Sequence, residues 1–175
     1  KDKTFSGEEI NVLLNFTQSV DDVNYKVFKA NKTEISQLLT DKNYVQFDNY
    51  LRLMKIVTSA TDEKTKTIDD AKVLKEGEGL LPKEDLQKSL NIYKLNYYIS
   101  HENYQGYEKT ALEYYKNTDE FNASELLAAA GVFNDHISNP KSLQMAARWA
   151  EKVVMSQENF DSTSILASLY DKLRK

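Results

Sequence analysis

The stretch ALEYY at residues 111–115 has a counterpart 35 residues later, AARWA at residues 146–150. Each stretch begins with alanine and carries a large ring at its fourth position, Tyr114 or Trp149. Small residues near bulky ones, returning at about 35 residues, indicate helical hairpins that stack on one another. A second pattern of a small residue and a ring recurs after 37 residues: Ala130 with Phe133, then Ala167 with Tyr170.

The composition of the 175 residues favours helices and excludes several functions. The chain has 5 Gly and 2 Pro with abundant Lys, Glu, Leu and Ala, which disfavours a turn-rich β fold. Its net charge of −4 includes no basic stripe, so we expect no nucleic-acid partner. No run approaches the ~20 apolar residues of a membrane span. The lack of cysteine excludes disulfides, thiolate metal sites and thiol redox chemistry in this chain.

Capping motifs indicate where helices begin. Ser6 with Glu9 and Asn122 with Glu125 have the spacing of a capping box, in which each side chain binds the other's backbone amide. With apolar residues at helical spacing, they predict about seven to nine helices, of which three or four lie within residues 6–57. The helices expected later in the chain begin at Pro82, Tyr104, Asn122, the Asn139-Pro140 pair and Asp161.

The organisation expected from these signals has three parts. Residues 1–57 form an N-terminal region of linker or cap helices, and residues 80–175 form the helical repeats. Residues 58–79 are rich in Thr, Lys, Asp and Glu and end in Gly77 and Gly79. We expect them to be a polar linker that includes one modest helix, with a mobile functional loop as the alternative.

From Leu86 onward the chain resembles the tetratricopeptide-repeat family, which stacks antiparallel helix pairs of about 34 residues. Alanine takes the family's glycine position, and the usual proline between units is replaced near Gln157. The resemblance implies an all-α fold of antiparallel helical hairpins stacked as a degenerate superhelix. It places Ala130 and Ala167 on first helices and the stretches 111–115 and 146–150 on second helices. First helices line the concave groove of the family, which implies four groove-facing residues: Asn134, Asp135, Ser168 and Asp171.

A narrower resemblance involves residues 146–152 and 159–173, which are similar to the helical tails of exported thioredoxin-like proteins of Bacteroidetes-type bacteria. Residues 22–31 look like the linker helix of the same proteins. The resemblance implies a periplasmic or cell-envelope location, with the chain otherwise soluble. It also implies an adjacent thioredoxin-fold domain with a Cys-x-x-Cys motif in the same parent chain. Because this chain has no cysteine, the resemblance does not imply redox activity for it. It does imply the role of the helical tail, which is to contact another protein or to position the neighbouring domain.

Candidate reactive residues are sparse. The histidines His101 and His136 are 35 residues apart, about one repeat, but metal binding needs three or four converging ligands. Acidic pairs such as Glu84-Asp85 stand at expected helix starts, where negative charge is favourable. Seven of the eleven tyrosines lie between Tyr93 and Tyr115, where they fit helix packing or a peptide groove. We therefore expect no catalytic residue, no cofactor site and no metal site.

These observations favour a non-catalytic protein-interaction or scaffold module, the tail of a larger thioredoxin-like protein. Its partner is expected to be a protein or a peptide. The alternative is a stand-alone peptide- or ligand-binding helical repeat protein, with a groove lined by Tyr97, Tyr98 and Asn134. A third hypothesis, a hydrolase or metal enzyme, would have to rely on His101 or His136.

Overall fold

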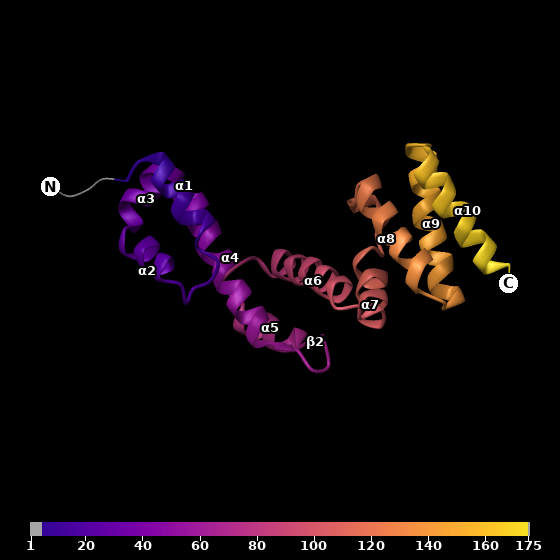
Figure 1. The fold of residues 1–175 in the computed structure, drawn as a ribbon, viewed down its shortest axis with the longest axis horizontal. Coiled ribbons are helices and arrows are strands. Elements are labelled where there is room, and N and C mark those ends of the chain that lie inside the picture. The colour runs from indigo at the N-terminus through magenta and orange to yellow at the C-terminus, as the bar shows by residue number, and fades with distance from the viewer. Residues whose placement is uncertain (1–4, 175) are drawn as a thin grey trace. The chain divides into compact units, whose positions relative to one another are not determined.

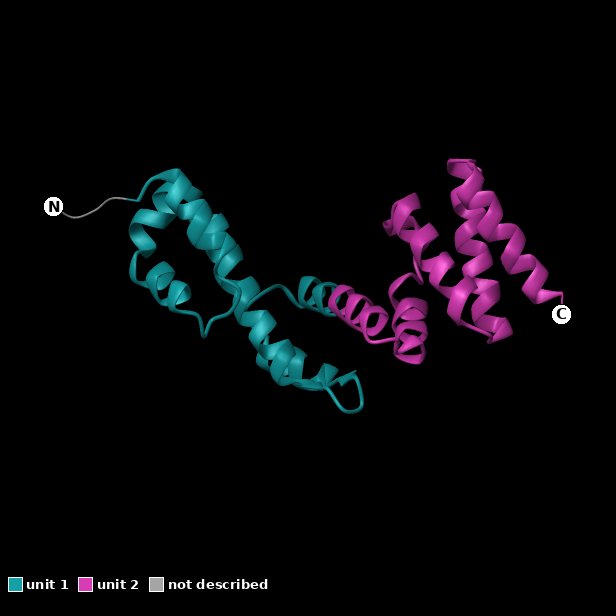
Figure 2. Ribbon diagram, in the orientation of Figure 1, with its two compact units in different colours: residues 1–90 teal, residues 91–175 magenta. Residues whose placement is uncertain are grey.

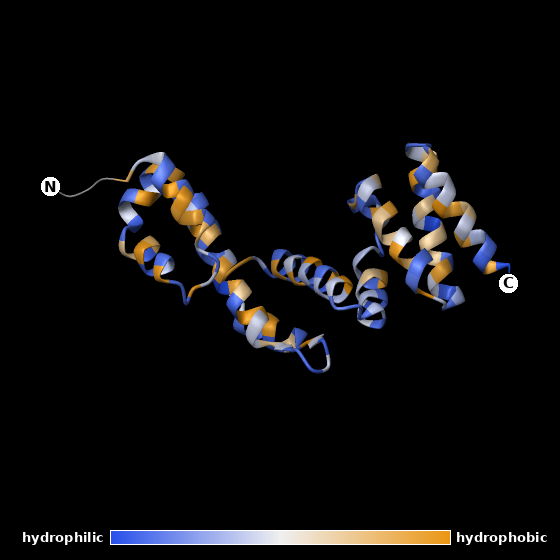
Figure 3. Ribbon diagram, in the orientation of Figure 1, coloured by the Kyte–Doolittle hydropathy of each residue, from blue (hydrophilic) through white to orange (hydrophobic). Residues whose placement is uncertain are grey.

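The computed structural model describes residues 5–174 and is all-α over that range, with ten α-helices and one small two-stranded sheet (Figure 1). The chain divides into two compact units, residues 1–90 and residues 91–175 (Figure 2). The division between the units falls inside α6 (Lys83–Ser100). The sequence predicts the boundary between the linker and the helical repeats earlier, between residues 79 and 80. Apolar and polar residues alternate around the helices of both units, as Figure 3 shows, which is the pattern of helices with one buried face.

The first unit begins with four helices: α1 (Gly7–Asn15), α2 (Val23–Ala30), α3 (Lys32–Leu39) and α4 (Asp41–Ser59). The capping box at α1 is confirmed, because the Ser6 hydroxyl accepts from the Glu9 amide and the Glu9 carboxylate accepts from the Ser6 amide. The ring of Phe28 is stacked on Tyr44, with ring centres 4.2 Å apart. Both belong to the buried cluster of this unit: Ile10, Leu13, Phe28, Ile35 and Tyr44.

The segment 58–79 contains more structure than one modest helix. After α4 ends at Ser59, β1 (Thr61–Asp62) pairs antiparallel with β2 (Thr67–Ile68), and α5 (Asp70–Glu76) follows. The Asp62 carboxylate accepts from the amides of Lys64 and Thr65 and so stabilises the turn of the hairpin. Ile68 and Val73 are buried, and α5 contacts α4. These apolar anchors make the segment part of the first unit.

A buried carboxylate joins α2 to α4. Asp48 Oδ1 accepts from the Tyr25 hydroxyl at 2.7 Å, and Oδ2 accepts from Lys29 Nζ at 2.9 Å. Burial by itself raises the pKa of the Asp48 carboxyl. The hydrogen bonds from Tyr25 and Lys29 and the positive charges of Lys29 and Arg52 lower the pKa by more than burial raises it. The net result is a pKa below the ordinary value of 3.8. Burial and the bond to Asp48 raise the pKa of Tyr25 to about 12.

We predict that Asp48→Asn will flatten the acid limb of the stability curve. Because the folded pKa of Asp48 is depressed, its charge stabilises the fold above pH 3.8, and that stabilisation is lost as the pH falls through the lower folded pKa. Urea unfolding at a series of acidic pH values should show the free energy of the parent chain falling more steeply than that of the variant. Parallel curves for the two proteins would contradict the prediction.

The second unit holds the C-terminal part of α6, then α7 (Tyr104–Tyr114), a 3₁₀ turn (Thr118–Glu120), α8 (Ala123–His136), α9 (Pro140–Ser156) and α10 (Phe160–Leu173). The capping box of Asn122 with Glu125 and the Asn139-Pro140 start are confirmed. The expected cap at Asp161 is wrong, because the Asn159 side chain accepts from the Ser162 amide and begins α10 two residues earlier. Asp161 lies in the first turn instead.

Rings and small residues fill the space between these helices. Trp149 is 0% exposed, and its ring centre lies 5.6 Å from that of Tyr115 and 5.0 Å from that of Phe133. The small residues of the repeat are buried beside these rings: Ala111, Ala130, Ala146 and Ala150. Ala167 is exposed and Tyr170 is 41% exposed, because within residues 5–174 no further helix covers that face of α10. Ala130 and Phe133 are thus buried as expected, whereas their counterparts Ala167 and Tyr170 lie on the surface.

We predict that Gly131→Ala will stabilise the second unit. Gly131 is in the interior of α8, where glycine is less favourable than alanine by about 0.5–1 kcal/mol. A methyl group there would meet Ile165 Cδ1 at 3.6 Å, an ordinary contact. Thermal or urea unfolding should therefore show a gain of that size.

Gly77→Ala is the matched contrast to this variant. A methyl group at Gly77 would lie 2.9 Å from the Val73 carbonyl oxygen, and a backbone atom cannot move aside cheaply. We expect a loss of about 1–3 kcal/mol from this overpacking. A loss of stability for Gly131→Ala would show that α8 and α10 have no room for the added group.

Candidate functional site

The two tyrosines expected to line a groove are packed among other side chains. Tyr97 is 7% exposed and Tyr98 is 5% exposed. The Tyr97 ring centre lies 6.2 Å from that of Tyr93, 5.9 Å from that of Tyr98 and 4.0 Å from that of His101. Rings buried in this way contribute packing area and offer little surface to a partner, so we do not include them in the candidate surface.

The other four expected residues lie on α8 and α10, which contact each other. Asp135 and Asp171 are exposed, while Asn134 and Ser168 are half-buried. We call this set the polar strip: Asn134, Asp135, Ser168 and Asp171. The strip combines two carboxylates with an amide and a hydroxyl, which suits a partner that brings hydrogen-bond donors or positive charge.

A lysine that sequence reasoning missed connects the two helices of the strip. Lys172 Nζ donates to the backbone carbonyl of Asn134, across from α10 to α8. The 37-residue offset of the repeat matches Asp135 with Lys172, so opposite charges occupy equivalent positions. The offset therefore pointed to Lys172 as a residue equivalent to Asp135. It gave no indication that the Lys172 side chain on α10 bonds to the backbone of α8. The Asn134 Oδ1 atom is buried and has no hydrogen-bond partner, although its Nδ2 donates to Asp135.

Each histidine is stacked on a tyrosine. The rings of His136 and Tyr104 are nearly parallel, with centres 3.8 Å apart, and this contact joins the end of α8 to the start of α7. His101 Nδ1 lies 2.8 Å from the Tyr97 carbonyl oxygen and 2.9 Å from the Ser100 hydroxyl. Among residues 5–174, no three His, Asp or Glu side chains converge as metal ligands do. In the described structure each histidine ring thus packs against a tyrosine ring.

The tyrosine-rich segment has the electrostatics of a packed core. Burial raises the pKa of Tyr115 to about 12, with a further contribution from Tyr114 and Glu125. Burial also raises the pKa of Tyr107 well above its ordinary value. Both hydroxyls stay protonated near neutral pH, so neither is poised to take up a proton from a bound molecule.

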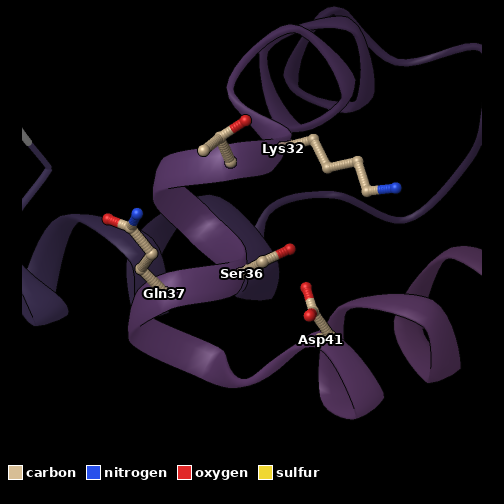
Figure 4. A pocket seen from close by; sticks show the side chains of 5 residues that line it. Lys32, Ser36, Gln37 and Asp41 are labelled. Atoms are coloured by element: carbon tan, nitrogen blue, oxygen red, sulfur yellow. The ribbon is translucent and has the colours of Figure 1, made fainter.

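A polar pocket lies in the first unit, away from every residue expected to form a site. It has a volume of about 340 Å³ and lies at α3 and the start of α4 (Figure 4). The Ser36 hydroxyl points toward the space between the side chains of Lys32 and Asp41, while Gln37 extends in another direction. The lining residues are Lys32, Thr33, Ser36, Gln37 and Asp41. No motif marks them, because the first four are ordinary residues of α3 and only the turn into α4 places Asp41 beside them.

Comparisons of this chain with protein-family models, with curated proteins and with solved structures each found no match. Within residues 5–174, no helix combines the length and the apolar character that crossing a membrane requires.

Proposed function

We propose that this chain is a non-catalytic protein-interaction or scaffold module whose second unit binds a protein or a peptide through the polar strip. The observation that carries the proposal is the contact pattern of the last four helices. Helix α8 contacts both α9 and α10, and α7 contacts both α8 and α9. Contacts of a helix with its neighbour and with the next-but-one helix are compatible with stacked helical hairpins, a kind of fold that typically serves as an extended binding surface.

The chemistry of the strip favours a basic or donor-rich partner. Asp135 and Asp171 are exposed carboxylates on neighbouring helices, and the nearby ammonium of Lys172 is bound to the Asn134 carbonyl. Because both carboxylates are exposed, a peptide with lysine, arginine or backbone amides directed at the strip would gain charge-assisted hydrogen bonds.

The test is selection of binding peptides from a random library displayed against the full chain, followed by affinity measurement on variants. Asp135→Ala combined with Asp171→Ala should weaken binding of the selected peptides about tenfold or more, because two charge-assisted bonds are lost. The matched control is Asp161→Ala, which removes an exposed carboxylate from the first turn of α10 and should leave affinity unchanged. A library that yields no binder, or equal losses in both variants, would remove the proposal.

The parent protein is part of the same proposal. The resemblance of residues 146–152 and 159–173 to exported thioredoxin-like proteins leads us to infer a thioredoxin-fold domain in the same parent chain, in the periplasm or cell envelope. The chain would then hold or place that domain. Sequencing the reading frame upstream of Lys1 tests this directly. A domain with a Cys-x-x-Cys motif is the expected result, and a stop codon or an unrelated enzyme there would contradict it while leaving the stand-alone peptide receptor in place.

A further inference from the structure

We propose that the pocket between α3 and the start of α4 binds a small zwitterion of the free α-amino acid class, held by Lys32, Ser36 and Asp41. This inference concerns the first unit and does not rest on the proposed function, which concerns the second. Five polar side chains line an open pocket of about 340 Å³, a volume at the lower end of the size range of small-molecule sites.

The first observation is the Ser36 hydroxyl, which is buried without a partner. Ser36 is 9% exposed, and its Oγ accepts and donates no hydrogen bond within the described residues. Several other helical hydroxyls of this chain bind a carbonyl of their own helix. Ser59 of α4 donates to the Ile56 carbonyl at 2.8 Å, and Ser156 of α9 donates to the Val153 carbonyl at 3.0 Å. Ser36 makes no such bond, although an unpaired buried hydroxyl destabilises a fold.

The second observation is the pair of opposite charges on either side of this hydroxyl. In Figure 4 the Ser36 oxygen lies between the side chains of Lys32 and Asp41. Within residues 5–174 neither charge has an ion-pair partner, and Lys32 Nζ lies 5.8 Å from the centre of the Tyr44 ring, which holds it by a cation–π contact. Figure 4 also shows the Asp41 carboxylate beside the Ser36 hydroxyl, whereas the Lys32 ammonium is directed away from that hydroxyl. The two charges thus border one pocket without neutralising each other.

These groups define the ligand by its chemistry. The Lys32 ammonium suits a carboxylate, the Asp41 carboxylate suits an ammonium group, and the Ser36 hydroxyl can donate to the ligand carboxylate. A simple anion would meet the charge of Asp41, and a simple cation would meet the charge of Lys32. A molecule that carries both groups a few bonds apart satisfies all three side chains at once.

The experiment is a titration of the full chain followed by amide chemical shifts in two-dimensional NMR. L-alanine is the probe, acetate tests the anion alone, and methylammonium tests the cation alone. We expect saturable shifts at Lys32, Ser36 and Asp41 with alanine only, and a dissociation constant in the millimolar range because the probe has few atoms. Absence of saturable shifts, or equal binding of acetate or methylammonium, would overturn the proposal.

Two variants make the titration specific. Asp41→Asn should weaken alanine binding about tenfold by removing one charge-assisted hydrogen bond. Asp161→Asn is its matched control, because it removes a carboxylate from the first turn of α10 and should leave binding unchanged. Ser36→Ala should weaken binding while raising the melting temperature, since it removes the unpaired hydroxyl. Unchanged affinity in Ser36→Ala or Asp41→Asn would overturn the proposal.

Discussion

Replacing Trp149 with alanine is expected to lower the free energy of unfolding by about 3–5 kcal/mol, the range for loss of a large core side chain. The indole is 0% exposed and makes edge contacts with Tyr115 and Phe133, so its removal leaves a cavity where three helices or their ends meet. Urea unfolding followed by far-UV circular dichroism measures the change without relying on the fluorescence of the lost residue.

Two further variants of α9 serve as controls for Trp149→Ala. Arg148→Ala alters the exposed neighbour of Trp149 and should change stability by no more than about 0.5 kcal/mol. Trp149→Phe keeps a ring in place and removes an indole N–H that is buried without a partner, so it should cost clearly less than the alanine variant. A loss below about 1 kcal/mol for Trp149→Ala would contradict the packing of the repeats, because a buried anchor cannot be removed so cheaply.

Replacing Phe28 with alanine is expected to have an effect of similar size in the first unit, about 3–5 kcal/mol. Phe28 is fully buried, stacked on Tyr44 and set edge-on to Phe47 with ring centres 5.2 Å apart. Aromatic pairs of this kind contribute about 0.5–1.5 kcal/mol beyond their buried area. The same urea experiment on the full chain measures the loss.

The controls for Phe28 lie on the same helix and at the same position. Lys26→Ala changes an exposed residue of α2 and should leave the midpoint of unfolding nearly unchanged. Phe28→Leu keeps most of the apolar volume but loses the stacking, so its loss should fall between those of the other two variants. If Phe28→Ala and Lys26→Ala behaved alike, the buried cluster of the first unit would not be what stabilises α2.

Much of the secondary structure followed from short-range signals. The capping boxes at Ser6 and at Asn122 formed as expected, because both partners of each box lie within one helical turn and depend on little else. The error at Asp161 has an equally local origin. Asn159 and Asp161 both favour the N-cap, and the extended backbone at Asn159 gave that residue the role.

Features that depend on contacts between distant residues were predicted less well from the sequence. Residues 58–79 form a hairpin and a helix against α4 because Ile68 and Val73 find apolar partners there, although the segment is polar on average. Tyr97 and Tyr98 were expected at a groove and are buried, since a tyrosine carries the same signal for packing and for binding. The pocket at Ser36 had no sequence signal, because its charges meet only through the turn from α3 to α4.

The sequence by itself determined that this chain is all-α, where most of its helices begin, and which alanines and rings recur along its second half. These properties depend on residues within one or two helical turns of each other, whose energies are set by local backbone geometry. Tertiary structure alone decided which tyrosines are buried, that Lys172 reaches Asn134, and that Lys32, Ser36 and Asp41 share one pocket. Each of these features involves at least two helices, and only the packing of those helices brings their residues within reach.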